Sequence, residues 1–268
     1  MHFGSMFLWR VHSLLLLVVV VAFSAPALHA QPAPSSGSPS TAADPWRFSV
    51  TPYAWALGIS GSVSYNDTRL GQVEMSPGNV LSNLNGAAMV VAQAQRGRLG
   101  FYLDAIYGDL TVDNSRTVQQ ASLNASTRID MTILTVAPSY TLHQSPSLIL
   151  DGVLGARFLW QNARTTIRLA ETGQSVTGQA SVNLADAIVG LKGRYNLGSS
   201  GYFVPFYVDI GGGQSSSLTT QAYVGLGHTF DWGDISLVAK NVYYQFTPNV
   251  RTVDLNLFGV AAAATFRF

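Results

Sequence analysis

Cysteine is absent from the 268 residues, and its absence removes several classes of site at once. Without thiols the chain can form no disulfide, no thiolate metal centre, no cysteine nucleophile and no lipidated N-terminal cysteine. Charge is scarce as well, because 11% of the residues are charged against about 25% in an average soluble domain. The 15 basic and 14 acidic residues nearly cancel, so the sequence offers no basic surface for nucleic acid.

A long hydrophobic run is also missing, although 47% of the residues are hydrophobic. The one apolar run near the N-terminus is shorter than the roughly 20 residues that a membrane-spanning helix needs. Arg10 precedes this run and small residues follow it, which predicts a signal peptide over 1–30, cleaved after Ala27 or Ala30. An N-terminal membrane anchor is the alternative. Residues 31–45, rich in Pro, Ser and Ala, are expected to form a flexible, disordered linker.

Beyond the linker, apolar side chains alternate with polar or small ones. Phe101, Leu103 and Ala105 share one parity, for example, while Tyr102 and Asp104 share the other. Successive side chains of a strand point to opposite faces, so this period predicts β-strands. The candidate strands are 46–60, 86–95, 99–112, 127–142, 148–168, 181–197, 202–213, 218–230, 235–246 and 254–268.

The connections between these strands alternate in length. The tight turns are 96–98, 143–147, 198–201 and 231–233. The remaining connections, mostly longer and polar, are 61–85, 113–126, 169–180, 214–217 and 247–253. Short periplasmic turns and longer extracellular loops are typical of outer-membrane barrels. The sequence therefore predicts an all-β fold, a transmembrane antiparallel up-and-down β-barrel of about ten strands over 46–268, with both barrel ends of the chain on the periplasmic side.

Pro52 interrupts the alternation of the first strand. Phe48 and Val50 lie on one parity, whereas Tyr53 and Trp55 lie on the other. A proline removes one donor from the hydrogen-bond ladder, so we expect a β-bulge at this position.

A soluble sandwich or lipocalin-like barrel would alternate in the same way, but the aromatic residues favour a lipid-facing apolar side. They gather beside the short turns, with a partial second group near the longer loops, as in the girdles of membrane barrels. The first group is Trp46, Tyr140, Tyr195, Tyr202, Phe230, Trp232 and Phe268, and the second is Tyr107, Trp160 and Tyr243. Phe266 and Phe268 also resemble the C-terminal assembly signal recognised by the bacterial barrel-assembly machinery.

The opposite parity carries charges of both signs, which would line the barrel interior. These residues are Arg47, Asp104, Asp151, Arg157, Asp186, Lys192, Arg194, Asp209, Lys240 and Arg267. Opposed charges in a narrow lumen should pair, which predicts a structural salt-bridge network; a narrow polar pore for small solutes or ions is the alternative. Counting outward from the turn 198–201 puts Asp209 nearly opposite Gly190, two residues from Lys192. We expect Asp209 to pair with Lys192, or else with Arg194.

The histidines argue against catalysis. A barrel hydrolase needs a base near its extracellular rim to activate serine or water. His143 and His228 fall near the short turns, and the other three histidines lie in or beside the predicted signal peptide. No metal-ligand spacing or phosphate-binding motif is present in the sequence, so we expect no metal and no cofactor. A hydrolase at the loop rim, built on Asp109 and Asp113, which flank one strand end, or on Asp186, which begins another strand, is the least favoured alternative.

Five stretches are similar to a family of proteobacterial outer-membrane β-barrel proteins of uncharacterised function. They are 51–59 (TPYAWALGI), 96–98 (RGR), 151–157 (DGVLGAR), 186–195 (DAIVGLKGRY) and 209–212 (DIGG). The resemblance implies a barrel in the outer membrane of a Gram-negative bacterium and implies no activity. Such a barrel would contact membrane lipid and lipopolysaccharide and would be inserted by the assembly machinery. The expected role is structural or that of a narrow polar pore, with ligand binding or adhesion through the extracellular loops as the competing function.

Overall fold

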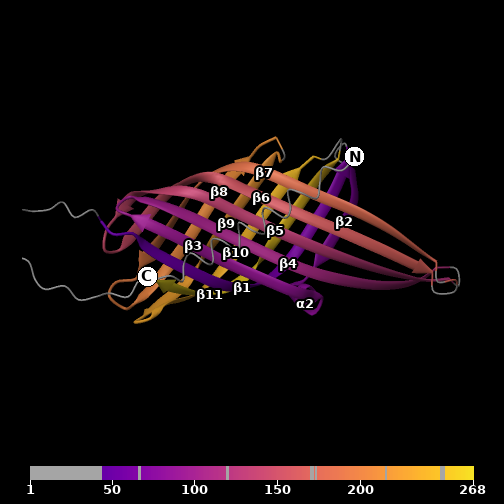
Figure 1. The fold of residues 1–268 in the computed structure, drawn as a ribbon, viewed down its shortest axis with the longest axis horizontal. Helices are drawn as coiled ribbons and strands as arrows, with labels where there is room; N and C mark the ends of the chain where they lie inside the picture. Colours follow the sequence, from indigo (N-terminus) through magenta and orange to yellow (C-terminus); the bar gives the residue numbers. More distant parts are fainter. Residues whose placement is uncertain are drawn as a thin grey trace, which may run out of the picture. The chain divides into compact units, whose positions relative to one another are not determined.

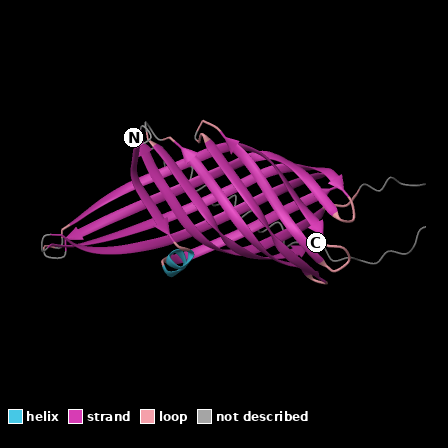
Figure 2. Cartoon of the chain, turned by 180° about the vertical axis from the view of Figure 1, so that it is seen from behind, coloured by secondary structure: helices cyan, strands magenta, loops and turns pink. Residues whose placement is uncertain are grey.

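The computed structural model describes residues 44–268 apart from 66–67, 119–120, 170–171, 173, 215 and 248–250. The predicted signal peptide and most of the predicted linker lie outside the described residues, so both stay predictions. In the described part the chain forms β-strands and one short helix (Figures 1 and 2). The elements are β1 (Arg47–Tyr65), β2 (Thr68–Met75), α2 (Pro77–Ser82), β3 (Leu84–Arg96), β4 (Leu99–Val118), β5 (Ala121–Gln144), β6 (Leu148–Leu169), β7 (Ser175–Asn196), β8 (Tyr202–Gly212), β9 (Leu218–Phe230), β10 (Gly233–Phe246) and β11 (Thr252–Arg267).

The wall is a closed antiparallel sheet. Strands β3 to β11 pair in chain order, β3 pairs with β1, and β11 pairs back to β1, which makes a barrel of ten strands with β2 as an extra strand beside β1. Closure gives the strands a hydrogen-bonded neighbour on each side, as a wall in lipid requires. The predicted ten-stranded antiparallel barrel is therefore confirmed. No helix in the described residues is long and apolar enough to cross a membrane.

The bulge expected at Pro52 is wrong. The register between β1 and β11 runs without a shift from Ser49 opposite Arg267 to Ser64 opposite Thr252. Tyr53 and Trp55 therefore point into the barrel, where Trp55 is buried. Instead of a bulge, the proline ends a ladder, since β1 pairs with β3 only as far as Pro52 opposite Val90.

Beyond Pro52 the wall is completed by a segment that the sequence predicted to be a loop. The second half of β1 turns back into β2, with Ile59 opposite Met75, and α2 follows. The Ser76 hydroxyl accepts a hydrogen bond from the amide of Asn79 (3.3 Å) and caps α2, which begins at a proline. Val80 of α2 is buried in the same apolar cluster as Trp55. The helix thus covers the interval between β1 and β3 with an apolar side chain.

Two other predicted loops are extensions of strands. Figure 1 shows β4 to β7 projecting beyond their neighbours at one end of the barrel, which we call the extended end. The pairing of β3 with β4 stops at Leu84 opposite Leu110, whereas β4 continues to Val118. The extensions are rich in Thr, Ser and Val, and the side chains of Thr127 and Thr165 hydrogen-bond across strands (3.0 Å). Such residues favour strands even where polar side chains occupy both faces, which is why composition alone indicated loops.

An apolar belt surrounds the barrel on its outer face. On β6 it runs from Leu148 to Trp160, which spans about 28 Å at roughly 3.3 Å per residue and a tilt of about 45°. Tyr107, Thr132 and Trp160 lie opposite one another at its upper margin. The next outward row on these strands is Asp109, Asp130 and Asn162. The belt therefore matches the roughly 25 Å apolar band of a membrane barrel, with charged residues directly above it.

The opposite margin of the belt, at the short-turn end, carries the predicted aromatic girdle. Exposed rings there belong to Trp46, Phe48, Tyr140, Tyr195, Tyr202, Phe230, Trp232, Phe266 and Phe268. Several contact one another: Phe230 stacks on Trp232 with ring centroids 5.8 Å apart, and Phe266 is tilted against Trp232 at 5.4 Å. His228 belongs to this girdle, edge-on to Tyr202 at 4.6 Å.

Phe268 closes the junction between the first and last strands. Its amide donates to the carbonyl of Phe48 (2.9 Å), and the Phe48 amide donates to the carbonyl of Phe268 (3.0 Å). The side chain of Phe268 is 77% exposed on the lipid-facing parity, while Arg267 points inward to Asp234. The terminal aromatic is thus presented outward, as an assembly signal requires.

We expect Phe268→Asp to lower the amount of barrel in the outer membrane, because it places a charge on the lipid-facing side of the closing strand. Arg267→Gln, whose side chain points inward, should have a milder effect. Folded barrels resist detergent, so unboiled protein should migrate differently from boiled protein on SDS gels, and the shifted fraction measures assembly. Equal shifted fractions for Phe268→Asp and the wild type would contradict a role of Phe268 in assembly.

Candidate functional site: a buried charge network and a vestibule in the barrel interior

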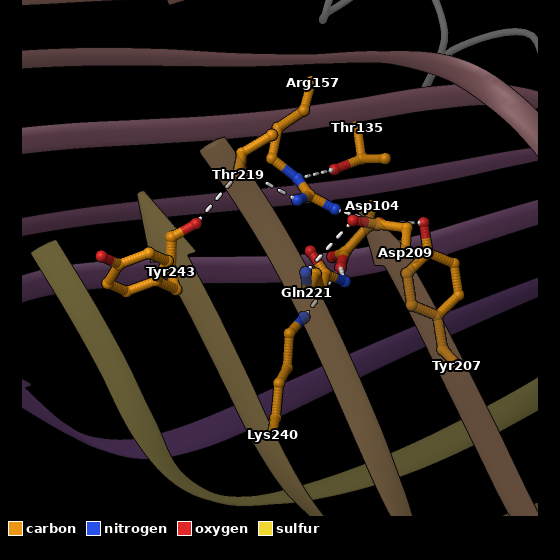
Figure 3. A network of polar contacts seen from close by, with 9 residues as sticks. All are labelled: Asp104, Thr135, Arg157, Tyr207, Asp209, Thr219, Gln221, Lys240 and Tyr243. Carbon is orange, nitrogen blue, oxygen red and sulfur yellow. Dashed lines mark hydrogen bonds and ion pairs between the residues drawn. The ribbon is translucent and has the colours of Figure 1, made fainter. Parts of the chain in front are cut away.

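The middle of the lumen is crossed by ion pairs and hydrogen bonds that we call the central network (Figure 3). It comprises Tyr53, Asp104, Thr135, Arg157, Tyr207, Asp209, Thr219, Gln221 and Lys240. Figure 3 draws all of these except Tyr53, together with Tyr243, whose backbone carbonyl accepts a hydrogen bond from Thr219 (3.2 Å). Arg157 of β6 forms an ion pair with Asp209 of β8, and both side chains are fully buried. The guanidinium also donates to the hydroxyls of Thr135 (3.1 Å) and Thr219 (3.2 Å), and the Tyr207 hydroxyl donates to Asp209 (2.5 Å).

The second half of the central network is built around Asp104 of β4. Its carboxylate accepts hydrogen bonds from Lys240 Nζ (2.7 Å), the Tyr53 hydroxyl (2.8 Å) and Gln221 Nε2 (3.0 Å). The backbone amide of Gln221 donates to Asp209 Oδ1 (3.1 Å), which joins the two halves. The network therefore ties together strands from opposite sides of the barrel, and each of its buried charges has an opposite charge beside it.

Glycines on the inner face let these long side chains fit. Gly190 lies directly opposite Asp209, and a Cβ at Gly190 would stand 2.6 Å from the Cβ of Asp209 and 2.2 Å from the carbonyl oxygen of Val208. Any larger residue there would force the carboxylate side chain or the strand to move. Gly190 therefore leaves the space in which the Asp209 side chain forms its ion pair with Arg157.

The expected pair between Asp209 and Lys192 is wrong, although the register behind it is right. Gly190 does lie opposite Asp209, but Lys192 lies directly opposite Asp151 on its other neighbour, β6. Lys192 Nζ donates to Asp151 (2.6 Å) and to Gln93 Oε1 (3.0 Å). Lys192 pairs with Asp151 because a directly opposed carboxylate is nearer than a diagonal one. Asp209 instead pairs with Arg157, which lies two strands away.

Three of the predicted lumen residues lie at the short-turn end, where they are less buried. Asp234 accepts hydrogen bonds from Arg194 Nη1 (2.8 Å) and from Arg267. Arg194 also lies over the ring of Phe203, 3.5 Å from its centroid. Arg47 is exposed, and the described residues give it no ion pair. The sequence did not single out Asp234, because it directly follows a turn and resembles a solvated turn residue.

Asp186, the remaining predicted lumen residue, is buried away from the cations. Its register partner on β6 is Arg157, but that guanidinium turns to Asp209. Ser216 donates to one carboxylate oxygen of Asp186, and the other oxygen has no hydrogen-bond partner in the described residues. Of the ten predicted charges, the structure thus joins Asp104, Arg157, Asp209 and Lys240 in the central network, pairs Asp151 with Lys192, puts Arg194 and Arg267 on Asp234, and leaves Arg47 and Asp186 outside these groups.

Above the central network, towards the extended end, the lumen is filled by an apolar cluster that the sequence did not predict. Its members there are Trp55, Leu57, Val80, Ile106, Ile133, Leu159, Leu184, Val242, Tyr244, Phe246 and Leu257. Two further members, Val238 and Ala261, lie on the short-turn side of Lys240 and line the cavity below the network. Ile133, Leu159, Val242 and Leu257 have no solvent exposure. At this level both faces of the strands are apolar, so alternation could not distinguish inside from outside. The sequence held one sign that Ile133 points inward: it has the same parity as Thr135 on the same strand.

Below the central network lies a cavity of about 550 Å³ that we call the vestibule. Its walls include residues of the short-turn end such as Arg47, Gln144, Arg194, Asp234 and Arg267. Tyr53, Tyr223 and Lys240 line its inner end, where the central network begins. The vestibule is therefore a pocket whose inner end is closed by the central network.

At the extended end, above the apolar belt, charged groups pair on the outer face. Asn85 Nδ2 (3.1 Å) and the Arg128 guanidinium (2.5 Å) both donate to Asp109, and these contacts lower the pKa of that carboxyl below its ordinary value. No group of three or more metal-ligating side chains occurs in the described residues, and His143 and His228 lie at the short-turn end. The rim as described thus holds no histidine base beside Asp109.

The closed wall, the apolar belt and the aromatic girdle define the chain as an outer-membrane β-barrel protein, and the short turns then mark the periplasmic end. No family profile and no curated protein sequence matches the chain, so membership of the family named above stays a prediction. Similar solved structures include outer-membrane barrels. They include Ail of Yersinia pestis (11% identity, 83% of this chain and 98% of that chain, TM-score 0.34), the translocator domain of the autotransporter NalP of Neisseria meningitidis (14%, 82% and 88%, 0.39) and OprG of Pseudomonas aeruginosa (11%, 84% and 97%, 0.31).

We expect Asp209→Ala to cost about 3–5 kcal/mol of stability, because it leaves the Arg157 charge buried and unpaired. The double variant R157L/D209L should recover most of that loss, since replacing both partners by apolar groups removes the buried charge altogether. Urea unfolding of the refolded barrel measures both effects, and Asp130→Ala, on the outer face above the belt, is the matched control. If Asp209→Ala couples to Lys192→Ala as strongly as to Arg157→Ala, the pairing described above is incorrect.

Proposed function

We propose that the protein is a closed outer-membrane barrel with a structural or binding role and that it is not an open pore. The observation that carries this proposal is the filling of the lumen. Arg157 and Asp209 are fully buried, and Lys240 and Asp104 are 3% and 1% exposed. The apolar cluster then occupies the lumen on the extracellular side of these residues.

The energetics support the same conclusion. A solute passing through the lumen would have to separate Arg157 from Asp209, and leaving one member of a buried pair alone costs about 3–5 kcal/mol. It would then have to cross the level of Ile133 and Leu159, where the side chains are packed without solvent exposure. A charged solute finds no partner among these apolar groups.

In planar bilayers we therefore expect the refolded wild-type protein to give no steady unit conductance. A wide-pore porin in the same bilayer serves as the positive control, and the heat-dependent gel shift shows that the barrel is folded. Steady conductance steps whose size changes in Asp104→Asn, but not in Asp130→Asn, would overturn the closed barrel and favour the narrow polar pore.

A second candidate function, binding at the cell surface, is supported by the sheet that projects at the extended end. Its outer strands have free edges: β4 continues past Leu110, where β3 has ended, and β7 begins before Ala187, the first residue that pairs with β8. Unpaired edge groups are ready partners for another polypeptide. Between Ser175 and Gly178 the residues of β7 are exposed as well.

The absence of cysteine allows a direct test of this orientation. Gln179→Cys lies on the projecting sheet, and Ser199→Cys lies in the tight turn between β7 and β8. We expect a membrane-impermeant maleimide to label Gln179→Cys on intact cells. The Ser199→Cys variant should react only after the outer membrane is permeabilised. The reverse pattern would mean that the sheet projects into the periplasm, and it would reject a role in surface binding.

A further inference from the structure

The vestibule at the periplasmic end has the charge of a binding site for anions. Its lining includes five cationic side chains: Arg47, Lys192, Arg194, Lys240 and Arg267. Lys192 is neutralised by Asp151 and Lys240 by Asp104, at Nζ–O distances of 2.6 and 2.7 Å. The remaining three, all arginines, have Asp234 as their one carboxylate partner among the described residues. A carboxylate on Phe268, the last residue of the sequence, would still leave one positive charge in excess.

These three arginines lie close together around the mouth. Ser49 of β1 lies opposite Arg267 of β11, so Arg47, two residues before Ser49 on the same face, is the diagonal neighbour of Arg267. Arg267 and Arg194 in turn meet at the carboxylate of Asp234. The side chains of Arg267 and Arg194 are 48% and 25% exposed, so their guanidinium groups can reach a molecule in the cavity.

The size and remaining lining of the vestibule fit a small organic molecule. A cavity of about 550 Å³ falls within the usual 300–1,000 Å³ range of small-molecule sites. Gln93, Gln95 and Thr141 add neutral hydrogen-bonding groups to the lining. Planar guanidinium groups bind phosphate and carboxylate oxygens through paired hydrogen bonds, which a lysine cannot do.

We propose that the vestibule binds a small polyanion from the periplasmic side, one that carries phosphate or carboxylate groups. The site goes beyond the proposed closed barrel and does not depend on it. A pocket that opens to the periplasm binds its anion whether or not the lumen above it conducts.

Calorimetric titration of the refolded barrel with inorganic pyrophosphate, in a neutral maltoside detergent at low salt, tests the site. We expect saturable binding of one pyrophosphate per barrel. The variant R47Q/R267Q should bind at least about tenfold more weakly, since one guanidinium then remains at the mouth. The variant R96Q/R98Q removes the same charge from the same end but from residues outside the vestibule lining, so it should bind like the wild type. Arg47→Gln alone changes a residue that has no ion-pair partner among the described residues, so it is the control for misfolding of the double variant.

The source of the anion is decided by repeating the titration in lipid nanodiscs. Equal pyrophosphate binding in phosphatidylcholine and phosphatidylglycerol discs supports a soluble periplasmic anion. Binding in phosphatidylcholine but not in phosphatidylglycerol discs supports the headgroup of an anionic lipid as the occupant. The proposal is overturned if the wild type shows no saturable binding, or if R96Q/R98Q weakens binding as much as R47Q/R267Q. Bilayer conductance, measured separately, tests the closed barrel and leaves this result unaffected.

Discussion

The structure depends on one constraint: a backbone that crosses lipid must satisfy every N–H and C=O group from within the protein. Pairing β11 back to β1 meets it, because the wall then has no free edge within the belt except where β1 leaves β3. Closure with ten strands also fixes a narrow interior. Once the interior is narrow, side chains fill it and little water remains. Charges such as Arg157 and Asp209 must then pair with each other, since an isolated buried charge is costly.

The interval between β1 and β3 illustrates how the wall tolerates a local departure from this rule. Pro52 has no amide hydrogen to donate, and the ladder to β3 ends there. The chain responds by folding β2 back onto β1 and laying the short helix α2 over the interval, with Val80 in the apolar cluster. Directly after the helix, the carbonyl of Asn83 accepts a hydrogen bond from the amide of Thr111 (2.9 Å), which links this segment to β4.

Along the barrel axis, from the extended end to the short-turn end, the interior changes in character. It is first apolar, then occupied by paired charges, and finally an open cavity with an excess of cationic side chains. The apolar cluster excludes water on the extracellular side, which strengthens the ion pairs of the central network beside it. The same network forms the inner end of the vestibule, where Lys240 lines the cavity. The two sides of the membrane therefore meet different surfaces: a projecting sheet with free edges outside, and a pocket with surplus arginines inside. A filled lumen and a binding pocket are compatible, because the residues that fill the lumen form the inner end of the pocket.

The sequence by itself determined the barrel, its strand number, the aromatic girdle and the inward parity of the buried charges, because strand period and lipid exclusion act residue by residue. It also determined the local register, such as Gly190 opposite Asp209. Only the tertiary structure decided which charges pair, because Arg157 reaches Asp209 across an intervening strand and Gln221 reaches Asp104 across the lumen. It likewise decided that Trp55 faces inward, that Arg194 and Arg267 share Asp234, and that Arg47 lines the same open cavity. Contacts across a closed barrel depend on its curvature and stagger, and no periodicity along a single strand encodes those.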